Sequence, residues 1–386
     1  MLVNGIINVN FALLILIMSF KLDKIEDAIA DIKAGKIIIV VDDEDRENEG
    51  DFIAAAEMVT PDMINFMATN GRGLICAPLT EGRCKTLELN MMVNNNTVLH
   101  NTQFTVSVDL IGQGCTTGIS THDRSKTIKA LTEPDTLSVH LGRPGHIFPL
   151  KAKTGGVLRR AGHTEAAIDL ARLAGLEPAG ILVEILNEDG SMARLPQLIE
   201  VGKKFDLKII SIAHMIAYRM KHESLIERSV EVDFNTVWGN FKLVAYKQTT
   251  TDDEHLAIYK GDWEIGDEVL VRVESSSFTH NLLDAIRSDK QSQLSAALKM
   301  IEENGRGALV FIQQEEKQIG LIEKLQAYSN GESNQTKSDK KDYGIGAQIL
   351  RDLKIQNLAL ISSNVNMNTS VVHAYGLEIS KIVPFK

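Results

Sequence analysis

The sequence predicts an α/β fold, built as an α+β sandwich in two domains, with a mixed-sheet domain first and a smaller α/β domain after it. At 386 residues the chain is longer than the ~100–200 residues of a typical single domain. Short β-branched runs alternate with segments of helical period, which indicates layers of helix and sheet. The pattern changes near residues 223–232, so we expect domains at 21–225 and 233–386.

The first elements follow from residue period and capping. Apolar residues recur at three- and four-residue steps from Leu22 to Ile32, and Gly35 then supplies a helix stop. Residues 36–42 form a β-branched run typical of a strand buried on both faces. Thr60 before Pro61 predicts the start of a helix. A second strand is expected at 73–78.

The remaining elements alternate in the same way. In the first domain we expect helices at 164–174, 196–205 and 213–227, with strands at 180–186 and 207–212. In the second we expect strands at 241–246, 255–259, 268–274, 307–313 and 358–362, and a long helix at 281–303. The polar stretch 329–342 has almost no apolar residues and is expected to be a loop.

Composition narrows the function classes. The formal net charge of −10 argues against broad affinity for nucleic acid or anionic membranes. Three cysteines, Cys76, Cys84 and Cys115, show no metal-type spacing and form a poor disulfide framework, which favours a reducing cytoplasm.

The first 20 residues are expected to be an apolar extension outside the fold. The run from Phe11 to Met18 is shorter than the ~20 residues of a membrane span and lacks the flanks of a secretory signal. We predict that the biological chain begins at Met18. Finding intact Met1 by mass spectrometry of the native protein's N-terminus would contradict this.

The segment 42–51, DDEDRENEGD, predicts a metal site. Seven carboxylates in ten residues repel one another unless a cation or basic partner compensates. The segment follows a predicted buried strand, where open α/β sheets place ligands. A solvated acidic loop is the alternative. Neither calcium-loop register closes with the required glutamate, because Ala54 or Ala56 stands in its place.

A second cluster, GGVLRRAGHTE at 155–165, predicts anion binding. Free N–H groups at the helix start suit a phosphate, and Arg160 adds a fixed charge. His163 alone would be a packing or capping residue, but beside the acidic segment it becomes a candidate ligand for a hard divalent ion.

Two further residues stand out. His146 lies in RPGHIFPL, which we interpret as a turn that presents the histidine to a site. Alternatively, His146 is a structural residue whose hydrogen bonds are satisfied within the turn. Glu184 interrupts the apolar strand ILVEIL, and an unpaired buried carboxylate is costly. Glu184 is therefore either paired or catalytic. The small-residue loop GCTTGIS at 114–120 offers several hydrogen-bond donors.

Together these motifs resemble the 3,4-dihydroxy-2-butanone 4-phosphate synthase family over about 22–222. The likeness is carried by VVDDEDRENEGD (40–51), MMVNNNT (91–97), FTVSVD (104–109), TTGIS (116–120), RPGHIFPL (143–150), GGVLRRAGHTEAAIDLARLAGL (155–176) and NEDGSMAR (187–194). The resemblance implies conversion of ribulose 5-phosphate to 3,4-dihydroxy-2-butanone 4-phosphate and formate in riboflavin biosynthesis. It also implies a homodimer with active sites at the subunit interface.

The same resemblance implies residue roles. Glu47 and His163 would hold Mg²⁺ or Mn²⁺, and His146 and Glu184 would be essential for catalysis. Glu49 and Asp42 would assist the reaction, and the motifs do not rank their contributions. The sugar phosphate would contact Arg46, Glu47, Asp51, Arg160, Ala161, Gly162, His163, Thr164 and Glu184.

The domain after about 233 resembles GTP cyclohydrolase II, through WGNF (238–241), QQEEKQIGLIEKLQAY (313–328) and DYGIGAQIL (342–350). That family holds a catalytic zinc with three cysteines. Here the aligned positions are Ser277, Ser288 and Lys290, so no zinc is expected. Asp339 matches the proton acceptor, whereas Lys341 replaces an arginine, and Glu315 and Lys317 depart from the substrate loop.

Three functional hypotheses follow. The first is a single-activity synthase with a degenerate second domain, and the second is a bifunctional enzyme that also opens the GTP ring. Zinc content distinguishes these two. The third is a non-catalytic acidic metal-binding or assembly module, which predicts no turnover.

Overall fold

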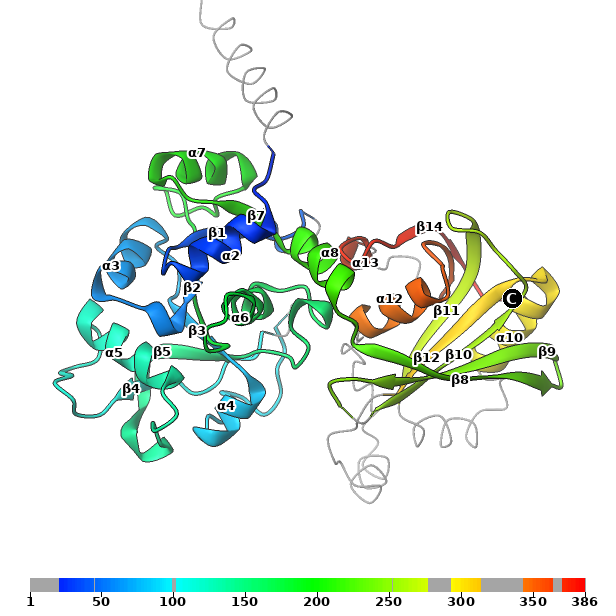
Figure 1. Cartoon of the computed structure of the whole chain (residues 1–386), viewed down its shortest axis with the longest axis horizontal. Helices are drawn as coiled ribbons and strands as arrows, with labels where there is room; N and C mark the ends of the chain where they lie inside the picture. The colour runs from blue at the N-terminus through cyan, green and yellow to red at the C-terminus, as the bar shows by residue number, and fades with distance from the viewer. Residues whose placement is uncertain are drawn as a thin grey trace, which may run out of the picture. The chain divides into compact units, whose positions relative to one another are not determined.

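The computed structural model describes residues 21–44, 46–98, 102–251, 253–276, 293–313, 343–363 and 370–385. Within this part the chain divides into two compact units between Tyr218 and Arg219 (Figure 1). Each unit is built on its own mixed sheet. The expected extension at 1–20, the loop at 329–342 and the aligned zinc positions fall outside the described residues.

The first unit is an α/β sandwich with strand order β4-β5-β3-β6-β2-β1-β7. Its strands are β1 (Ile38–Val41), β2 (Gly50–Ala55), β3 (Cys76–Leu79), β4 (Val108–Leu110), β5 (Leu141–Lys151), β6 (Gly180–Glu184) and β7 (Ile209–Ser211). Its helices are α2 (Ile25–Lys33), α3 (Pro61–Asn70), α4 (Glu81–Thr86), α5 (Thr121–Thr132), α6 (His163–Leu173) and α7 (Leu195–Phe205), and α8 (Ile212–His222) spans the division between the two units.

The central strands are covered on both faces, as the apolar run at 36–42 predicts. All four residues of β1 are buried. Ile39 and Phe52 pack in one cluster with Ile64 of α3 and Leu198 of α7. Helix α6 packs against β2, β6 and β3 and against α2. The sheet centre is therefore dry, and polar side chains at the strand ends are placed on a rigid base.

Local signals set several boundaries correctly. The Thr60 hydroxyl accepts a hydrogen bond from the N–H of Met63 at 3.1 Å and caps α3. Gly35 has a φ of +74°, where the chain leaves α2. The strand expected at 73–78 begins later, at Cys76, because the Leu74 N–H donates to the side chain of Glu184 at 2.8 Å rather than to a neighbouring strand.

The second unit has strand order β14-β13-β11-β12-β10-β9-β8. The strands are β8 (Ile226–Thr236), β9 (Gly239–Gln248), β10 (Glu254–Lys260), β11 (Glu268–Ser276), β12 (Gly307–Gln313), β13 (Asn357–Ile361) and β14 (Glu378–Val383). The described helices are α10 (Gln293–Asn304), α12 (Tyr343–Asp352) and α13 (Ser370–His373). All five predicted strands are present, and the described part of the helix expected at 281–303 is α10.

The helix expected at 213–227 ends before the predicted residue. The division between the two units also lies earlier than the expected end of the first domain at 225. Helix α8 ends at His222. The backbone N–H of Leu225 donates to the side-chain oxygen of Gln348 in α12 at 2.8 Å. The chain between α8 and β8 therefore already makes a hydrogen bond to a helix of the second unit.

Candidate active site

The acidic segment forms a tight loop between two buried strands, β1 and β2. Asp42 organises it: its carboxylate accepts the N–H of Glu47 at 3.1 Å, the N–H of Glu49 at 2.8 Å and the Arg46 guanidinium at 2.8 Å. Asn48 takes a φ of +56°, a conformation that asparagine tolerates better than most residues. Both oxygens of Asp42 are thus engaged in shaping the loop.

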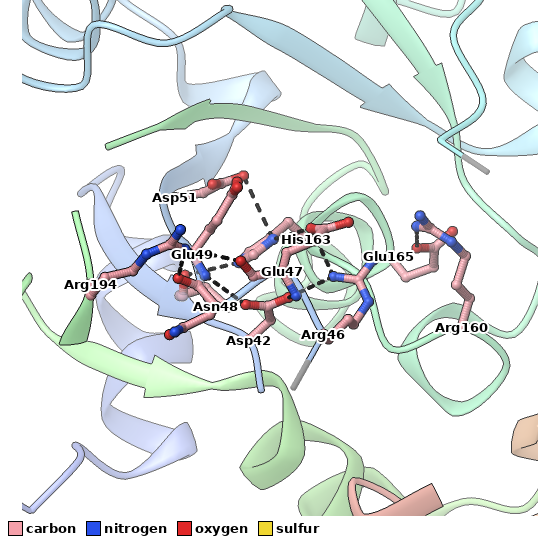
Figure 2. Close-up of polar contacts among 11 residues, drawn as sticks. Asp42, Arg46, Glu47, Asn48, Glu49, Asp51, Arg160, His163, Glu165 and Arg194 are labelled. Atoms are coloured by element: carbon pink, nitrogen blue, oxygen red, sulfur yellow. Dashed lines mark hydrogen bonds and ion pairs between the residues drawn. The ribbon is translucent and has the colours of Figure 1, made fainter. Parts of the chain in front are cut away.

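Arg194 holds the outer side of this loop. Its Nη1 donates to the carbonyls of Glu47, at 2.9 Å, and of Asn48 (Figure 2). Arg194 is the N-cap residue, immediately before α7. A helix distant in sequence therefore fixes the backbone that carries Glu47.

His163 approaches the loop from the first residue of α6. Its Nε2 lies 3.1 Å from the carbonyl oxygen of Val40. Because a carbonyl only accepts, Nε2 carries a hydrogen, and in the neutral imidazole the lone pair is on Nδ1. Nδ1 lies 3.8 Å from Oε2 of Glu47 and 3.9 Å from Oδ2 of Asp51. Such anchoring of one ring nitrogen is typical of histidines that bind metal through the other.

The charges around His163 are unbalanced. Burial, together with the charges of Glu184 and Glu47, raises the pKa of Asp51 to about 7. Burial raises the pKa of Glu49 as well, and Glu47 adds to the effect. Burial acts to lower the pKa of His163, but the charge of Asp51 and the contact with Glu47 outweigh it and raise that pKa to about 9. The site has more negative charge than its imidazole neutralises.

These residues fit a divalent cation. Asp42, Glu47 and His163 each bring one ligand atom within 4.8 Å of the others. Oδ1 of Asp51 is buried and has no hydrogen-bond partner among the described residues. A cation would compensate both the unpaired oxygen and the excess charge, and the oxygen-rich ligand set with one nitrogen suits Mg²⁺ or Mn²⁺. Asp42 accepts three hydrogen bonds in the loop, and Glu47 is paired with Arg46 at 2.8 Å.

A pocket extends from this cluster across the ends of β2 and β6. Asp51 of β2 pairs with Glu184 of β6 across the antiparallel strands. Oε2 of Glu184 accepts the N–H of Leu74 at 2.8 Å, so Glu184 is partnered as well as facing the pocket. The pocket contains about 420 Å³ of empty space, open solvent at its mouth included. Its walls include Cys76, Thr102, Phe104, Leu150 and Leu182.

The N-terminus of α6, which carries His163, also borders the pocket. Gly162 is the N-cap residue, and as a glycine it has no side chain that could cap the first N–H groups. Arg160 lines the pocket with Thr164, and its Nη1 donates to Glu165 at 2.6 Å. Uncapped N–H groups beside a guanidinium are suited to binding an anion, which is the role that the sequence predicts for 160–164.

His146 is placed differently from the prediction. It lies in strand β5 rather than in a turn. Val108 and Asp109 of β4 pair with Ile147 and Gly142, so residues 143–146 of β5 bulge out of the ladder. His146 is not among the described residues that line the pocket. The structure thus brings together Arg46, Glu47, Asp51, Arg160, His163, Thr164 and Glu184 but leaves His146 apart.

Sequence reasoning missed two contributors. Arg194 ends the motif NEDGSMAR, but nothing local indicates its role, because its contacts are to backbone carbonyls far away in sequence. Asp109 contacts His146 through both carboxylate oxygens. It stands in the motif FTVSVD, but nothing local distinguishes it from a surface carboxylate.

The described helices include none long and apolar enough to cross a membrane. None of the three cysteines is disulfide-bonded.

Comparison with known proteins places both units in families. A family model described as 3,4-dihydroxy-2-butanone 4-phosphate synthase matches residues 26–218, and one described as GTP cyclohydrolase II matches residues 227–384. Riboflavin biosynthesis protein RibBA of Cytophaga hutchinsonii is 56% identical over 376 residues, covering 95% of this chain and 93% of that protein. RibBA of Bacillus cereus (strain G9842) is 50% identical over 373 residues, covering 94% and 93%.

Two solved structures are similar in fold. RibBX from A. baumannii, described as a two-domain 3,4-dihydroxy-2-butanone 4-phosphate synthase, is 39% identical with a TM-score of 0.64, covering 94% of this chain and 99% of that one. A 3,4-dihydroxy-2-butanone 4-phosphate synthase in complex with two magnesium ions is 42% identical with a TM-score of 0.50, covering 52% and 98%. The chain therefore belongs to the 3,4-dihydroxy-2-butanone 4-phosphate synthase family of enzymes, and its synthase domain is followed by a domain of the GTP cyclohydrolase II family.

Proposed function

We propose that the first domain converts ribulose 5-phosphate to 3,4-dihydroxy-2-butanone 4-phosphate and formate, using Mg²⁺ or Mn²⁺. The observation that carries the proposal is one pocket in which Glu47, His163, Glu184 and the uncapped start of α6 converge. The two products sum to the substrate, so the reaction requires no oxidant or other co-reactant. The pocket needs only to bind a phosphate, hold a cation and move protons.

The binding roles follow from position. The N–H groups at the start of α6, with Thr164 and Arg160, hold the phosphate group of the substrate. Arg46, at the metal-facing end, and Asp51 hold sugar oxygens. A divalent ion bound by Glu47 and His163 supplies electrostatic stabilisation of negative charge that develops on the sugar oxygens. The magnesium ions in the related synthase structure support this choice of cation.

Proton transfer falls to Glu184 and His146. The Glu184 carboxylate lies at the pocket wall, held by the Leu74 N–H, and its free lone pairs accept a proton from substrate. His146 is the second acid–base residue implied by the motif. Because it does not line the pocket of its own subunit, we propose that the enzyme is a homodimer and that the partner's copy of this histidine completes each site.

The test of this function is formate release from ribulose 5-phosphate with Mg²⁺, assayed with and without chelator. The proposal expects turnover that chelator abolishes and that either Mg²⁺ or Mn²⁺ restores. Absence of turnover with metal present would favour the non-catalytic module. Turnover that persists in chelator would refute the role of the metal.

We further propose that the second domain does not hydrolyse GTP. Its sequence contains no cysteine, and Ser277, Ser288 and Lys290 replace the zinc-binding thiolates of the family. Neutral hydroxyls and an ammonium are poor zinc ligands. The description of RibBX names one activity for a two-domain chain, which supports this reading. The alternative, a bifunctional enzyme, is favoured by membership of the cyclohydrolase family.

The two alternatives differ in zinc content and in product. We expect purified full-length protein to contain no stoichiometric zinc by elemental analysis and to release no formate from GTP, while it releases formate from ribulose 5-phosphate. Stoichiometric zinc together with formate release from GTP would establish the bifunctional enzyme.

A further inference from the structure

Asp109 binds His146 at two points. It lies on β4, the edge strand of the first sheet. Its Oδ1 accepts the backbone N–H of His146 at 2.9 Å, and its Oδ2 lies 2.6 Å from Nδ1 of the imidazole. The histidine ends the bulge at 143–146. One carboxylate therefore fixes both the backbone and the ring of a residue that the strand ladder leaves unpaired.

The contact determines where the ring carries its hydrogen. A carboxylate only accepts hydrogen bonds, so the neutral imidazole must carry its hydrogen on Nδ1. Nε2 is then left with a lone pair. The histidine side chain is 43% exposed, whereas that of Asp109 is 19% exposed. The ring is thus held on its inner side and accessible on the outer.

The loop 116–120 packs over the bonded side of the pair. Gly118 has a φ of +91°, and a Cβ at this position would overlap Oδ2 of Asp109 and lie 2.7 Å from Nδ1 of His146. Asp123 at the start of α5 holds the loop by accepting from Thr116 N at 3.1 Å, Thr116 Oγ1 at 2.8 Å and Gly118 N at 3.1 Å. Only glycine permits the loop to approach so closely.

We propose that Asp109 is a positioning residue that fixes the Nδ1–H tautomer of His146, so that Nε2 is the atom that accepts a proton from substrate. The proposal rests on the function proposed above for His146. It assigns a role to a carboxylate outside the metal cluster and its pocket. It also explains why the loop 116–120 contains a glycine at 118.

Asp109→Asn tests this directly. The backbone N–H of His146 requires an acceptor, so the amide oxygen must take the place of Oδ1 and the amide NH₂ must face Nδ1. Both hydrogen bonds survive, but the donor now lies on the side chain at 109. The ring must therefore move its hydrogen to Nε2. The substitution inverts the tautomer while it preserves the shape of the site.

Ser107→Ala is the matched control. The Ser107 hydroxyl accepts the N–H of Gly145 at 3.1 Å. This variant removes a hydrogen bond from the same bulge without touching the ring. Both variants and the wild-type protein are labelled with ¹⁵N at histidine. The imidazole resonances of His146 are recorded at a pH at which the spectrum shows a neutral ring. Formate release is measured on the same samples.

We expect the Nδ1–H form in wild type and Ser107→Ala, and the Nε2–H form in Asp109→Asn. The kcat for formate release should fall ~10²–10⁴-fold in Asp109→Asn, as expected for a wrong histidine tautomer, with little change in KM. An Nε2–H ring in wild type, or near-normal kcat in a variant with an inverted ring, would overturn the proposal. If wild type releases no formate, the proposed function fails, and the resonances alone decide the positioning role.

Discussion

Glu47 and His163 come together from two elements, a loop and the start of a helix. Glu44 lies in the same loop but is exposed, and it is not among the residues that line the pocket. Glu44 and Glu47 carry the same carboxylate group and differ only in position. This difference provides a control within the loop for the assigned metal ligands.

We predict that Glu47→Gln and His163→Ala each lower formate release by at least ~10²-fold, on the scale of lost electrostatic catalysis, and abolish Mn²⁺ binding measured by calorimetry. Glu44→Gln removes the same charge from the same loop and should change both quantities little. Near-normal turnover of either site variant at saturating metal would contradict the ligand assignment.

Gly118 and Gly112 allow a second comparison between single residues. Both have positive φ, at +91° and +74°, but an added Cβ at 112 meets nothing within 4 Å. Gly112→Ala should therefore cost only the ~1–2 kcal/mol of a left-handed alanine. Gly118→Ala adds overlap with Asp109 and His146.

We predict that Gly118→Ala lowers formate release and the free energy of unfolding more than Gly112→Ala, measured by urea denaturation and steady-state kinetics. Equal effects of the two alanines would show that the close approach of the loop to the Asp109–His146 pair does not matter.

At the scale of elements, α7 supports the acidic loop between β1 and β2 through its N-cap residue, Arg194. The guanidinium binds the carbonyls of Glu47 and Asn48 and does not itself supply a ligand. At the other end of the same helix, Lys203 and Glu200 form an exposed ion pair, of the kind that contributes ~0–1 kcal/mol.

We predict that Arg194→Ala weakens Mn²⁺ binding ~10-fold or more, on the scale of outer-shell metal partners, because the loop backbone loses its outer support. Lys203→Ala, on the same helix, should leave metal affinity unchanged. Calorimetry on the two full-length variants measures the difference. Unaltered affinity in Arg194→Ala would show that Asp42 alone organises the loop.

At the scale of the whole molecule, the separation of His146 from the pocket leads us to predict that activity requires the proposed dimer. Glu184→Gln and His146→Ala each remove one residue from every site. In a mixed dimer whose sites are assembled across the interface, one of the two sites combines an intact Glu184 from one subunit with an intact His146 from the other. If each site is assembled within one subunit, neither site has both residues.

We predict that the mixed dimer of Glu184→Gln and His146→Ala, purified through two different tags, has ~half of the wild-type activity, since one of two symmetric sites is intact. Dimers of each variant with itself, carrying the same tags, serve as controls and should be inactive. A mixed dimer no more active than these controls would place both residues in one subunit.

The sequence by itself determined the type and order of most elements. Residue period, β-branched runs and the cap at Thr60 depend on neighbours along the chain, so they identify helices and strands without tertiary information. The strand expected at 307–313 matches β12 at both ends. The motifs also predicted Glu47, His163 and Glu184 as site residues, because unusual charge density or a carboxylate in an apolar strand is visible locally.

Tertiary structure decided what depends on contacts between distant segments. The start of β3 shifts because Glu184 takes the Leu74 N–H, and α8 ends early because Gln348 binds Leu225. His146 leaves the predicted turn for a bulge, where Asp109 orients its ring. In each case a hydrogen-bond partner far away in sequence satisfies a backbone or side-chain group, and such pairings become available only when the sheet has brought the segments together.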